Sequence, residues 1–413
     1  MSSNPSALAD RTAALLLKGY AWLPGMVRRH GSPLFTRLMG RPAVAVRGPE
    51  AVRFVYDERH VVRGPAMPEP VLSTLFGKGA VHTLDGEPHR VRKAMFLALL
   101  TDPGRVADLT EQVADAWERA VPEWSEREEI VLFDEAAVVL ARAVCRWAGV
   151  PLEEADVRPL ARDLVAMVDG FATAGPRHWR ARRARSRREF WAAGIVEEVR
   201  DDALAPPEGS ALDVIARHRD ADGLLLEPRV AGVELLNVLR PTVAVTWFLS
   251  FAGHLLHHRP DVRDRLWADD AAYLAAFVHE LRRFYPFAPL IGGLAPADVS
   301  FQGRGIPEGA MVVLDLFGQN HDEELWGDPY VFRPERFLER PVERDELVPQ
   351  GGGDPAHGHR CPGEAVTIAL LEALTLRLAR LEHRVVPGQD LRISLHRMPA
   401  RPCGGLRITV TGK

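Results

Sequence analysis

Apolar residues recur at helical spacing along most of the chain, which predicts a mainly α-helical protein. The longest apolar segment is Val230–His258, and it suits a central helix of roughly 40 Å at about 1.5 Å per residue. A second strongly periodic helix is predicted from Ala365 to Leu378. Pro241 removes a backbone hydrogen bond from the long helix and clashes with the carbonyl of Asn237, so we expect a kink between these two residues.

Strand patterns are few and short. The segments that read as strands are Pro42–Arg47, Val312–Leu316 and Leu406–Val410. Phe284–Ile291 is apolar but broken by prolines, which predicts an extended segment, and His321–Leu338 reads as an irregular meander. We therefore expect a large helical part and a small β-rich part, near residues 40–60 and in the C-terminal region.

Composition excludes several classes of protein. The 413 residues are 46% hydrophobic and 26% charged, as in ordinary globular proteins, and no linker divides them, so we expect one domain over residues 1–413. A net charge of −4 argues against a general nucleic-acid binder. Leu15–Leu17 is followed at once by Lys18, and Arg240 and Pro241 interrupt the long apolar segment, so neither a signal sequence nor a membrane span is expected.

The chain has three cysteines, which is too few for a disulfide framework and fits a reducing cytoplasm. Cys145 lies in the apolar segment Ala136–Val150 and is predicted to pack in the core. Cys403, between Pro402 and Gly404, has no predicted role.

Cys361 ends a glycine-rich loop that starts at Gln350 and leads into the second predicted helix. Pro362 suits the first turn of that helix, and the helix dipole lowers the pKa of a nearby thiol. His359 and Arg360 add donor groups beside it. A thiolate here can be a nucleophile or a metal ligand. Because no second cysteine is near enough to complete a zinc site, a haem iron, which accepts one thiolate as its protein ligand, fits best.

Arg240 lies among apolar residues of the long helix. A guanidinium is permanently charged, and burying it unpaired costs several kcal/mol, so an anion must lie beside it. That anion is either a carboxylate of the protein or the carboxylate of a substrate held by the planar fork.

Two further basic groups stand out. A helix beginning at Pro88 carries His89, Arg92 and Lys93 within about one turn, where they can hold two carboxylates or form a solvated face. The arginine-rich run Arg177–Arg188 is an exposed helix face, a docking surface for an acidic partner, or an attractive rim for an anionic substrate.

Three motifs together resemble a known family. Cys361-Pro362-Gly363 resembles the haem-ligand loop of cytochrome P450 enzymes. Upstream, Glu280 and Arg283 resemble the Glu-x-x-Arg helix motif of that family, and Arg336 resembles the arginine that joins the pair. The resemblance implies the cytochrome P450 fold, haem b as cofactor with Cys361 as axial ligand, and a haem buried between the long central helix and the cysteine-loop helix.

The central helix departs from the common pattern of that family. Most members carry an acidic residue followed by threonine to deliver protons to iron-bound oxygen, whereas this chain has Arg240-Pro241. This pair, with Gly351–Asp354 in the cysteine loop, resembles the fatty-acid peroxygenase branch. The resemblance implies hydrogen peroxide as co-substrate, a long-chain fatty acid as substrate and no obligatory redox partner.

The resemblance also implies roles for individual residues. Arg240 holds the fatty-acid carboxylate beside the iron, with Pro241 replacing the alcohol and His82 handling protons. For His82, a cap of the loop or a contact with haem is the alternative. His82 corresponds to a position with glutamine in hydroxylases and histidine in members that favour alkenes, so we expect hydroxy acids, terminal alkenes or both, with a lean toward decarboxylation. The residues expected to hold haem are Arg63, His89, Arg92, Lys93 and His359. The residues expected to line the substrate channel are Phe76, Phe171, Phe287 and Leu290, with plain core packing as the alternative, notably for Phe171.

Two other functions stay open at this point. One is a conventional monooxygenase fed by a ferredoxin docked on Arg177–Arg188. The other is a non-catalytic haem-thiolate sensor or ligand carrier, which leaves the buried Arg240 without a purpose.

Overall fold

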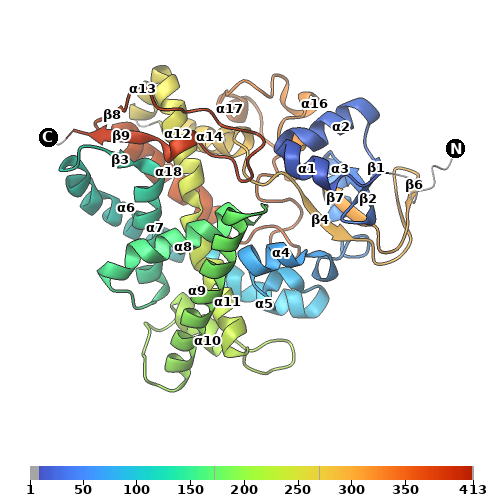
Figure 1. Ribbon diagram of the computed structural model, residues 1–413, viewed down its shortest axis with the longest axis horizontal. Helices are drawn as coiled ribbons and strands as arrows, with labels where there is room; N and C mark the ends of the chain where they lie inside the picture. Colours follow the sequence, from blue (N-terminus) through green and yellow to red (C-terminus); the bar gives the residue numbers. More distant parts are fainter. Residues whose placement is uncertain (1–8, 172, 269, 412–413) are drawn as a thin grey trace.

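The computed structural model describes residues 9–171, 173–268 and 270–411. Helices dominate it, as the apolar periodicity predicts (Figure 1). The longer helices are α1 (Thr12–Lys18), α2 (Trp22–His30), α3 (Pro49–Val55), α5 (Gly86–Leu100), α6 (Pro103–Ser125), α7 (Leu132–Ala148), α8 (Glu154–Gly170), α9 (Pro176–Arg200), α10 (Ala211–Arg217), α11 (Pro228–Val243), α12 (Val245–His258), α13 (Pro260–Trp267), α14 (Ala271–Phe284) and α18 (Glu364–Arg380). The shorter helical segments are η2 (Gly19–Ala21), η3 (Gly64–Ala66), α4 (Glu69–Val71), the π-helical η4 (Leu72–Phe76), η5 (Val81–Thr83), α15 (Leu316–Asn320), α16 (Glu323–Trp326), α17 (Arg336–Glu339) and η6 (Cys403–Gly405).

The strands of the described residues form small sheets. The strands are β1 (Leu34–Leu38), β2 (Arg41–Val46), β3 (Ile130–Val131), β4 (Ile291–Leu294), β5 (Val299–Phe301), β6 (Arg304–Ile306), β7 (Met311–Leu314), β8 (His383–Val385) and β9 (Arg407–Val410). Their orders are β1-β2-β7-β4, β3-β9-β8 and β5-β6. The three predicted strands are thereby confirmed as β2, β7 and β9, each within one or two residues of its expected bounds.

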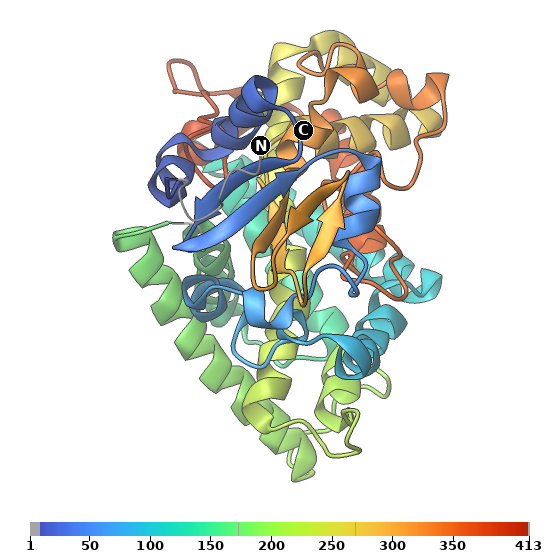
Figure 2. The same ribbon diagram turned by 90° about the vertical axis from the view of Figure 1, so that its right-hand side faces the viewer.

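Parallel pairing of β2 with β7 brings together segments far apart in the sequence, with Val44 opposite Val312. Figure 2 shows the early strands and the later ones side by side in this sheet. The sheet lies on the side of the molecule near the N-terminus, and the sheet of β3, β8 and β9 lies on the opposite side near the C-terminus (Figure 1). The helical bulk, with the largest apolar core, lies between the two sheets and extends below them in Figure 1.

The predicted central helix is present as two consecutive helices, α11 and α12. The expected kink between Asn237 and Pro241 is wrong in position, because α11 continues through Pro241 to Val243 and the interruption falls at Ala244. The N–H of Ala244 still donates to the carbonyl of Arg240, and the tighter turn comes next, where the N–H of Trp247 reaches back only three residues to Ala244. Helix α11 thus continues past Pro241 although this residue has no N–H to donate.

Within the described residues, the segment Pro228–His258 is long and apolar enough to cross a membrane. However, 89% of its most apolar window is buried inside the protein, as expected for a core helix. The expectation that this segment is no membrane span therefore agrees with its packing.

Candidate active site

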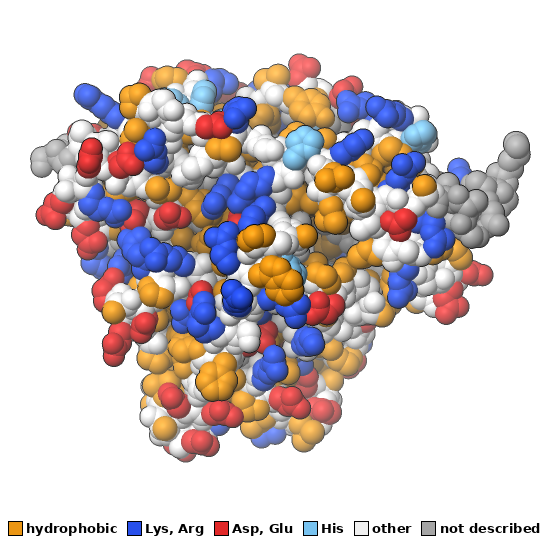
Figure 3. Space-filling model, viewed as in Figure 1, with side chains coloured by type: hydrophobic (Ala, Val, Ile, Leu, Met, Phe, Trp, Pro, Cys, Tyr) orange, Lys and Arg blue, Asp and Glu red, His pale blue; other side chains and the backbone are white. Residues whose placement is uncertain are grey.

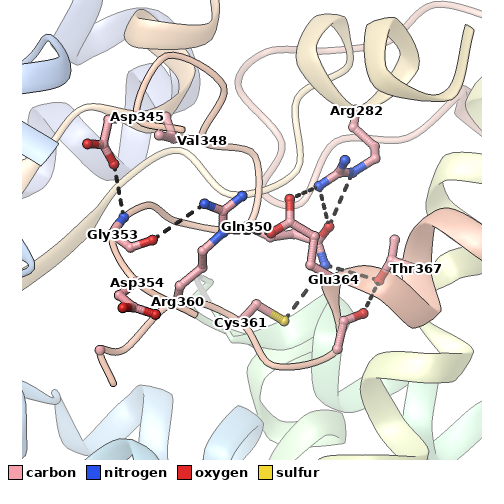
Figure 4. A network of polar contacts seen from close by, with 12 residues as sticks. Arg282, Asp345, Val348, Gln350, Gly353, Asp354, Arg360, Cys361, Glu364 and Thr367 are labelled. Carbon is pink, nitrogen blue, oxygen red and sulfur yellow. Dashed lines mark hydrogen bonds and ion pairs between the residues drawn. The ribbon is translucent and has the colours of Figure 1, made fainter. Parts of the chain in front are cut away.

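The cysteine loop is held by a network of side chains from α14 and α18 (Figure 4). The side chain of Gln350 donates from Nε2 to the Sγ of Cys361 at 3.7 Å and to the hydroxyl of Thr367 at 3.0 Å. Arg282 donates to Oε1 of the same amide at 2.9 Å and also forms an ion pair with Glu364. The loop is therefore rigid where Cys361 lies, and the amide nitrogen of Gln350 faces the sulfur.

Two expectations about Cys361 are corrected. Helix α18 begins at Glu364, so Pro362 lies before it rather than in its first turn. Burial raises the pKa of the Cys361 thiol, and the backbone N–H of Gly363 and the amide of Gln350 oppose this only in part. The helix terminus alone does not make a thiolate here. A bound metal ion would, because coordination removes the thiol proton.

The other two cysteines do not fit a buried metal site. Cys145 is buried in α7, where desolvation raises its pKa to about 12, and its predicted core role is confirmed. Cys403 is exposed, in η6. Cys361, by contrast, lies just before α18, which packs against α12 of the central helix pair.

Arg240 is buried, with 6% of its surface exposed. Its guanidinium donates to Oδ1 of Asn237 at 3.0 Å and lies over the ring of Phe76 at 5.6 Å, while its Nε has no partner. Among residues 9–171, 173–268 and 270–411, no carboxylate forms an ion pair with it, so a protein carboxylate is excluded as its predicted anion within this part of the chain. Burial, and then the nearby Arg185, lower the pKa of Arg240 to about 9.

His82 lies beside this arginine, with its ring stacked on Phe76 at a centroid distance of 4.0 Å and its Nδ1 without a partner. Burial and the charge of Arg240 lower the pKa of His82 well below its usual range. The expectation that this histidine titrates near neutral pH is therefore corrected for the protein without substrate, in which the ring is neutral.

The basic residues of α5 do not act as one cluster. Arg92 forms ion pairs with Glu234 at 2.9 Å and with Asp220. Lys93 donates to the backbone carbonyls of the cysteine loop, including that of Arg360 at 2.9 Å. The prediction that Arg92 helps to hold haem is corrected, because protein carboxylates already engage it, and the contacts of Lys93 make it a brace of the cysteine loop.

His89 is different. Its ring stacks on His359 at 3.9 Å, and desolvation and the charge of a protonated His359 lower the pKa of His89 to about 3. The Nδ1 of His89 and the Nε of the buried Arg63 have no hydrogen-bond partner within the described chain, whereas the Nε2 of His359 lies 3.4 Å from Asp85. The buried His89 and Arg63 thus have unused capacity for the carboxylates of a haem, and the half-buried His359 stacks beside them.

The motif residues on α14 and α17 meet as predicted. Arg283 pairs with Glu280 at 2.7 Å, and the Nε of Arg336 lies 3.1 Å from the same carboxylate. All three side chains are buried. This cluster joins the helix that carries Arg282 to the segment that leads into the cysteine loop.

The predicted channel residues divide into two groups. Phe76, Phe171 and Phe287 pack against the main core, and Phe287 contacts Trp247 and Phe248 of α12. Leu290 instead packs against the core cluster beneath the β1-β2-β7-β4 sheet. Its role as a substrate contact stays a prediction, as do those of the three phenylalanines.

Sequence reasoning missed the polar residues that position the site. Gln350 and Arg282 belong to motifs already noted, but nothing in the sequence indicated which groups they contact. Asn237 and Glu234 lie about one and two turns before Arg240 on α11, and their polarity within an apolar helix was the available signal.

Comparisons with known proteins agree with this site. The family described as cytochrome P450 matches residues 261–408. A relative from Streptomyces melanosporofaciens, cyclooctat-9-en-7-ol 5-monooxygenase, is 25% identical over 74% of this chain and 73% of its own. Cytochrome P450SP alpha (CYP152B1), in complex with (R)-ibuprophen, has a TM-score of 0.93 and 41% identity over 97% of this chain and 98% of that one.

Two more solved structures are similar over nearly the whole chain. A single-substitution variant of cytochrome P450 OleT, in complex with arachidonic acid, has a TM-score of 0.92, with 34% identity over 97% of this chain and 96% of that one. Cytochrome P450EX alpha (CYP152N1) with myristic acid has a TM-score of 0.91, with 38% identity over the same shares.

The fold and the cysteine loop define a haem-thiolate oxidoreductase, and the chain belongs to the cytochrome P450 family. Within that family it belongs with the CYP152 proteins, so the predicted resemblance to the fatty-acid peroxygenase branch is confirmed. The predicted mainly α fold and the haem cofactor are confirmed with it, and a non-catalytic sensor or carrier is set aside.

Proposed function

We propose that this protein uses hydrogen peroxide to oxidise long-chain fatty acids at the carbons nearest the carboxylate, giving hydroxy acids, terminal alkenes or both. The observation that carries the proposal is the buried guanidinium of Arg240 without a carboxylate partner among the described residues. An organic acid is the ligand that such a group binds best. Two similar structures contain fatty acids, arachidonic acid and myristic acid.

Haem, held by the residues with unused polar atoms, completes the site. Cys361 would ligate the iron, and Arg63, His89 and His359 would hold its carboxylates. When bound, haem supplies the iron centre at which peroxide becomes an oxidant, and the thiolate ligand favours O–O cleavage.

Arg240 would position the substrate. A bidentate pair between its guanidinium and the fatty-acid carboxylate fixes the adjacent carbons in the site, which converts binding energy into orientation of the reacting atoms. Phe76 packs against the arginine and His82, so the anchored headgroup would lie between apolar walls that exclude water. Pro241 leaves no hydroxyl at the following position of α11.

The carboxylate of the substrate would also handle protons. It would lie beside His82 and take the place of the acid–alcohol pair that this chain lacks. Burial is the main cause of the lowered pKa of His82, and the charge of Arg240 is the next; an anion bound at Arg240 would offset the second cause and raise this pKa. His82 would then hold or give a proton at the headgroup.

This proposal does not require a redox partner. The arginine run Arg177–Arg188 gives little support to a docking surface for one. Arg177 pairs with Asp169, Arg185 with Glu189, and Arg187 with Asp163. The exposed-face interpretation is thus wrong for Arg185, which is buried. Figure 3, which shows the side on which α9 lies, has basic side chains mixed with apolar ones rather than a continuous basic surface.

We further propose that residues 1–413 form a single haem domain that acts in the cytoplasm. The three cysteines, all free, support a reducing compartment.

The test is direct. Purified holoenzyme is incubated with a mixture of fatty acids and hydrogen peroxide, without reductase, and the products are analysed by mass spectrometry. Consumption of acids with formation of hydroxy acids or alkenes is expected. If turnover appears only with NADPH, ferredoxin and a reductase, the enzyme is a conventional monooxygenase instead.

A further inference from the structure

Arg240 is the last member of a buried polar chain along α11 that the proposed function does not use. The chain runs from Arg240 to Asn237 and on to Glu234, with hydrogen bonds of 3.0 Å each. Glu234 is fully buried and pairs with Arg92 of α5, which reaches the half-buried Asp220.

The orientation of the Asn237 amide is set by its neighbours. Its Nδ2 donates to Oε2 of Glu234 and to the backbone carbonyl of Phe76, both at 3.0 Å. Both partners are acceptors, so turning the amide over would place oxygen against oxygen twice. The Oδ1 must therefore face Arg240, where it accepts a hydrogen bond.

Glu234 also holds the loop between η4 and η5, which connects Phe76 to His82. The N–H of Val81 donates to its Oε1 at 2.7 Å, and Arg92 donates to the same oxygen and to the carbonyl of Gly79, both at 2.9 Å. Burial raises the pKa of Glu234, but all of these partners donate, which stabilises the charged form. The carboxylate of Glu234 thus connects this loop, through Asn237, to Arg240.

We propose that Glu234 is a positioning residue that directs Arg240 toward the substrate carboxylate through Asn237, while Arg92 keeps Glu234 from neutralising Arg240. Glu234 precedes Arg240 by six residues, about 9 Å along the helix, so it does not bind the arginine itself. With Glu234 neutralised by Arg92, the charge of Arg240 remains available for an external anion. This inference rests on the proposed role of Arg240.

The test compares an acid with its uncharged analogue. In Glu234→Gln, the remaining carbonyl oxygen would accept from Val81 and Arg92, and the new amide NH₂ would face Asn237. Asn237 would then lose one of the two acceptors that fix its orientation, so its Oδ1 would be held less firmly against Arg240. We expect the Kd for myristic acid, by calorimetry on holoenzyme, to rise about tenfold, as for one charge-assisted hydrogen bond, while the Kd for tetradecanol stays unchanged.

Glu135→Gln is the matched control. Glu135 is a buried carboxylate paired with Arg127 and Arg158, in α7 and outside this network. The Glu135→Gln variant should bind myristic acid and tetradecanol as wild type does. If Glu234→Gln fails to fold, the pair Arg92→Gln with Glu234→Gln, which leaves no unpaired charge buried, should show the same selective loss of the acid.

A double-mutant cycle with Arg240→Leu decides between positioning and a general structural role. Glu234→Gln should cost little acid affinity when Arg240 is already absent. Equal losses for acid and alcohol, losses that add in the cycle, or no loss at all would each overturn the inference. If Arg240→Leu binds myristic acid as tightly as wild type does, the proposed function itself is wrong. That outcome is read from the single variant, so it is distinguishable from a failure of the inference about Glu234.

Discussion

At the scale of single residues, the site is defined by polar groups that lack partners. The buried guanidinium of Arg240 and the unpartnered ring nitrogens of His82 and His89 lie close enough to interact electrostatically, and the unpartnered Nε of Arg63 lies near the His359 ring that stacks on His89. Buried polar groups are nearly always satisfied, so a concentration of unsatisfied ones indicates ligands that belong there.

The first prediction at this scale concerns Arg240. Arg240→Leu should bind fatty acids more weakly by about 2–5 kcal/mol, because a buried charge pair with the carboxylate is lost. Haem content should stay normal, since the hydrogen bond of Arg240 goes to Asn237 of its own helix rather than to the cysteine loop. Binding is measured by spectral titration with myristic acid. Arg240→Lys keeps the charge but not the planar guanidinium, so its affinity for myristic acid should lie between those of wild type and Arg240→Leu. Unchanged affinity in Arg240→Leu would contradict the assignment.

The second prediction concerns His82, which stacks on Phe76 beside Arg240. Glutamine can donate a hydrogen bond there but does not give up a proton near neutral pH, so His82→Gln should lower the ratio of alkene to hydroxy acid. The ratio is measured by gas chromatography of products formed with hydrogen peroxide. An equal ratio in both proteins would exclude His82 as a proton relay.

At the scale of elements, two polar clusters hold the haem-binding region together. Glu280, Arg283 and Arg336 join α14 to α17, and Arg282 with Gln350 joins α14 to the cysteine loop. Glu280 and the three arginines are buried, so each cluster depends on complete pairing for its stability.

Glu280→Gln leaves two buried arginines without their anion, so it should cost about 3–5 kcal/mol of folding stability and lower the haem content. The measurements are urea unfolding and the haem-to-protein ratio. Glu339→Gln, which removes a mostly exposed pair with Arg333, is the control and should change little. Normal stability and haem content in Glu280→Gln would contradict this role.

The hydrogen bond from Gln350 to the sulfur should tune the haem. A donor to the sulfur withdraws electron density, so Gln350→Leu should shift the reduction potential to a more negative value. Thr367→Val removes the other acceptor of the same amide group and keeps the donor to sulfur, so its potential should stay near that of wild type. Spectroelectrochemical titration decides, and identical potentials in Gln350→Leu and wild type would refute the link.

At the scale of the whole molecule, buried and half-buried histidines set the response to acid. Burial lowers the pKa of His254, His279 and His321 to about 4 each. Between that value and about 6.5, the unfolded chain binds protons that the folded chain does not, so stability falls as the pH falls through this range.

We therefore expect the free energy of unfolding to be smaller at pH 5.5 than at pH 7.5. The slope is at most about 1.4 kcal/mol per pH unit for each such histidine. His321→Gln should reduce the slope, and a substitution at the exposed His396 should not. Urea unfolding across this range tests the prediction, and a flat profile would contradict it.

Much of this protein was determined by the sequence alone. Apolar periodicity predicted the helical bulk and the long helix of α11 and α12, because burial of one helix face needs only local spacing. Cys361 and Arg240 could also be singled out as candidate site residues, because a lone thiol in a glycine-rich loop and a charge inside an apolar helix are chemically unusual in any fold.

Only the tertiary structure decided which groups meet. The contact of Arg92 with Glu234 joins α5 to α11, residues that are distant in the chain, and no local pattern distinguishes it from a haem contact. The raised pKa of Cys361 and the lowered pKa of His82 likewise arise from burial, which depends on every element packed around them. Local spacing can thus place a charged or nucleophilic side chain on an element, while its partners and its protonation depend on the packing of the whole chain.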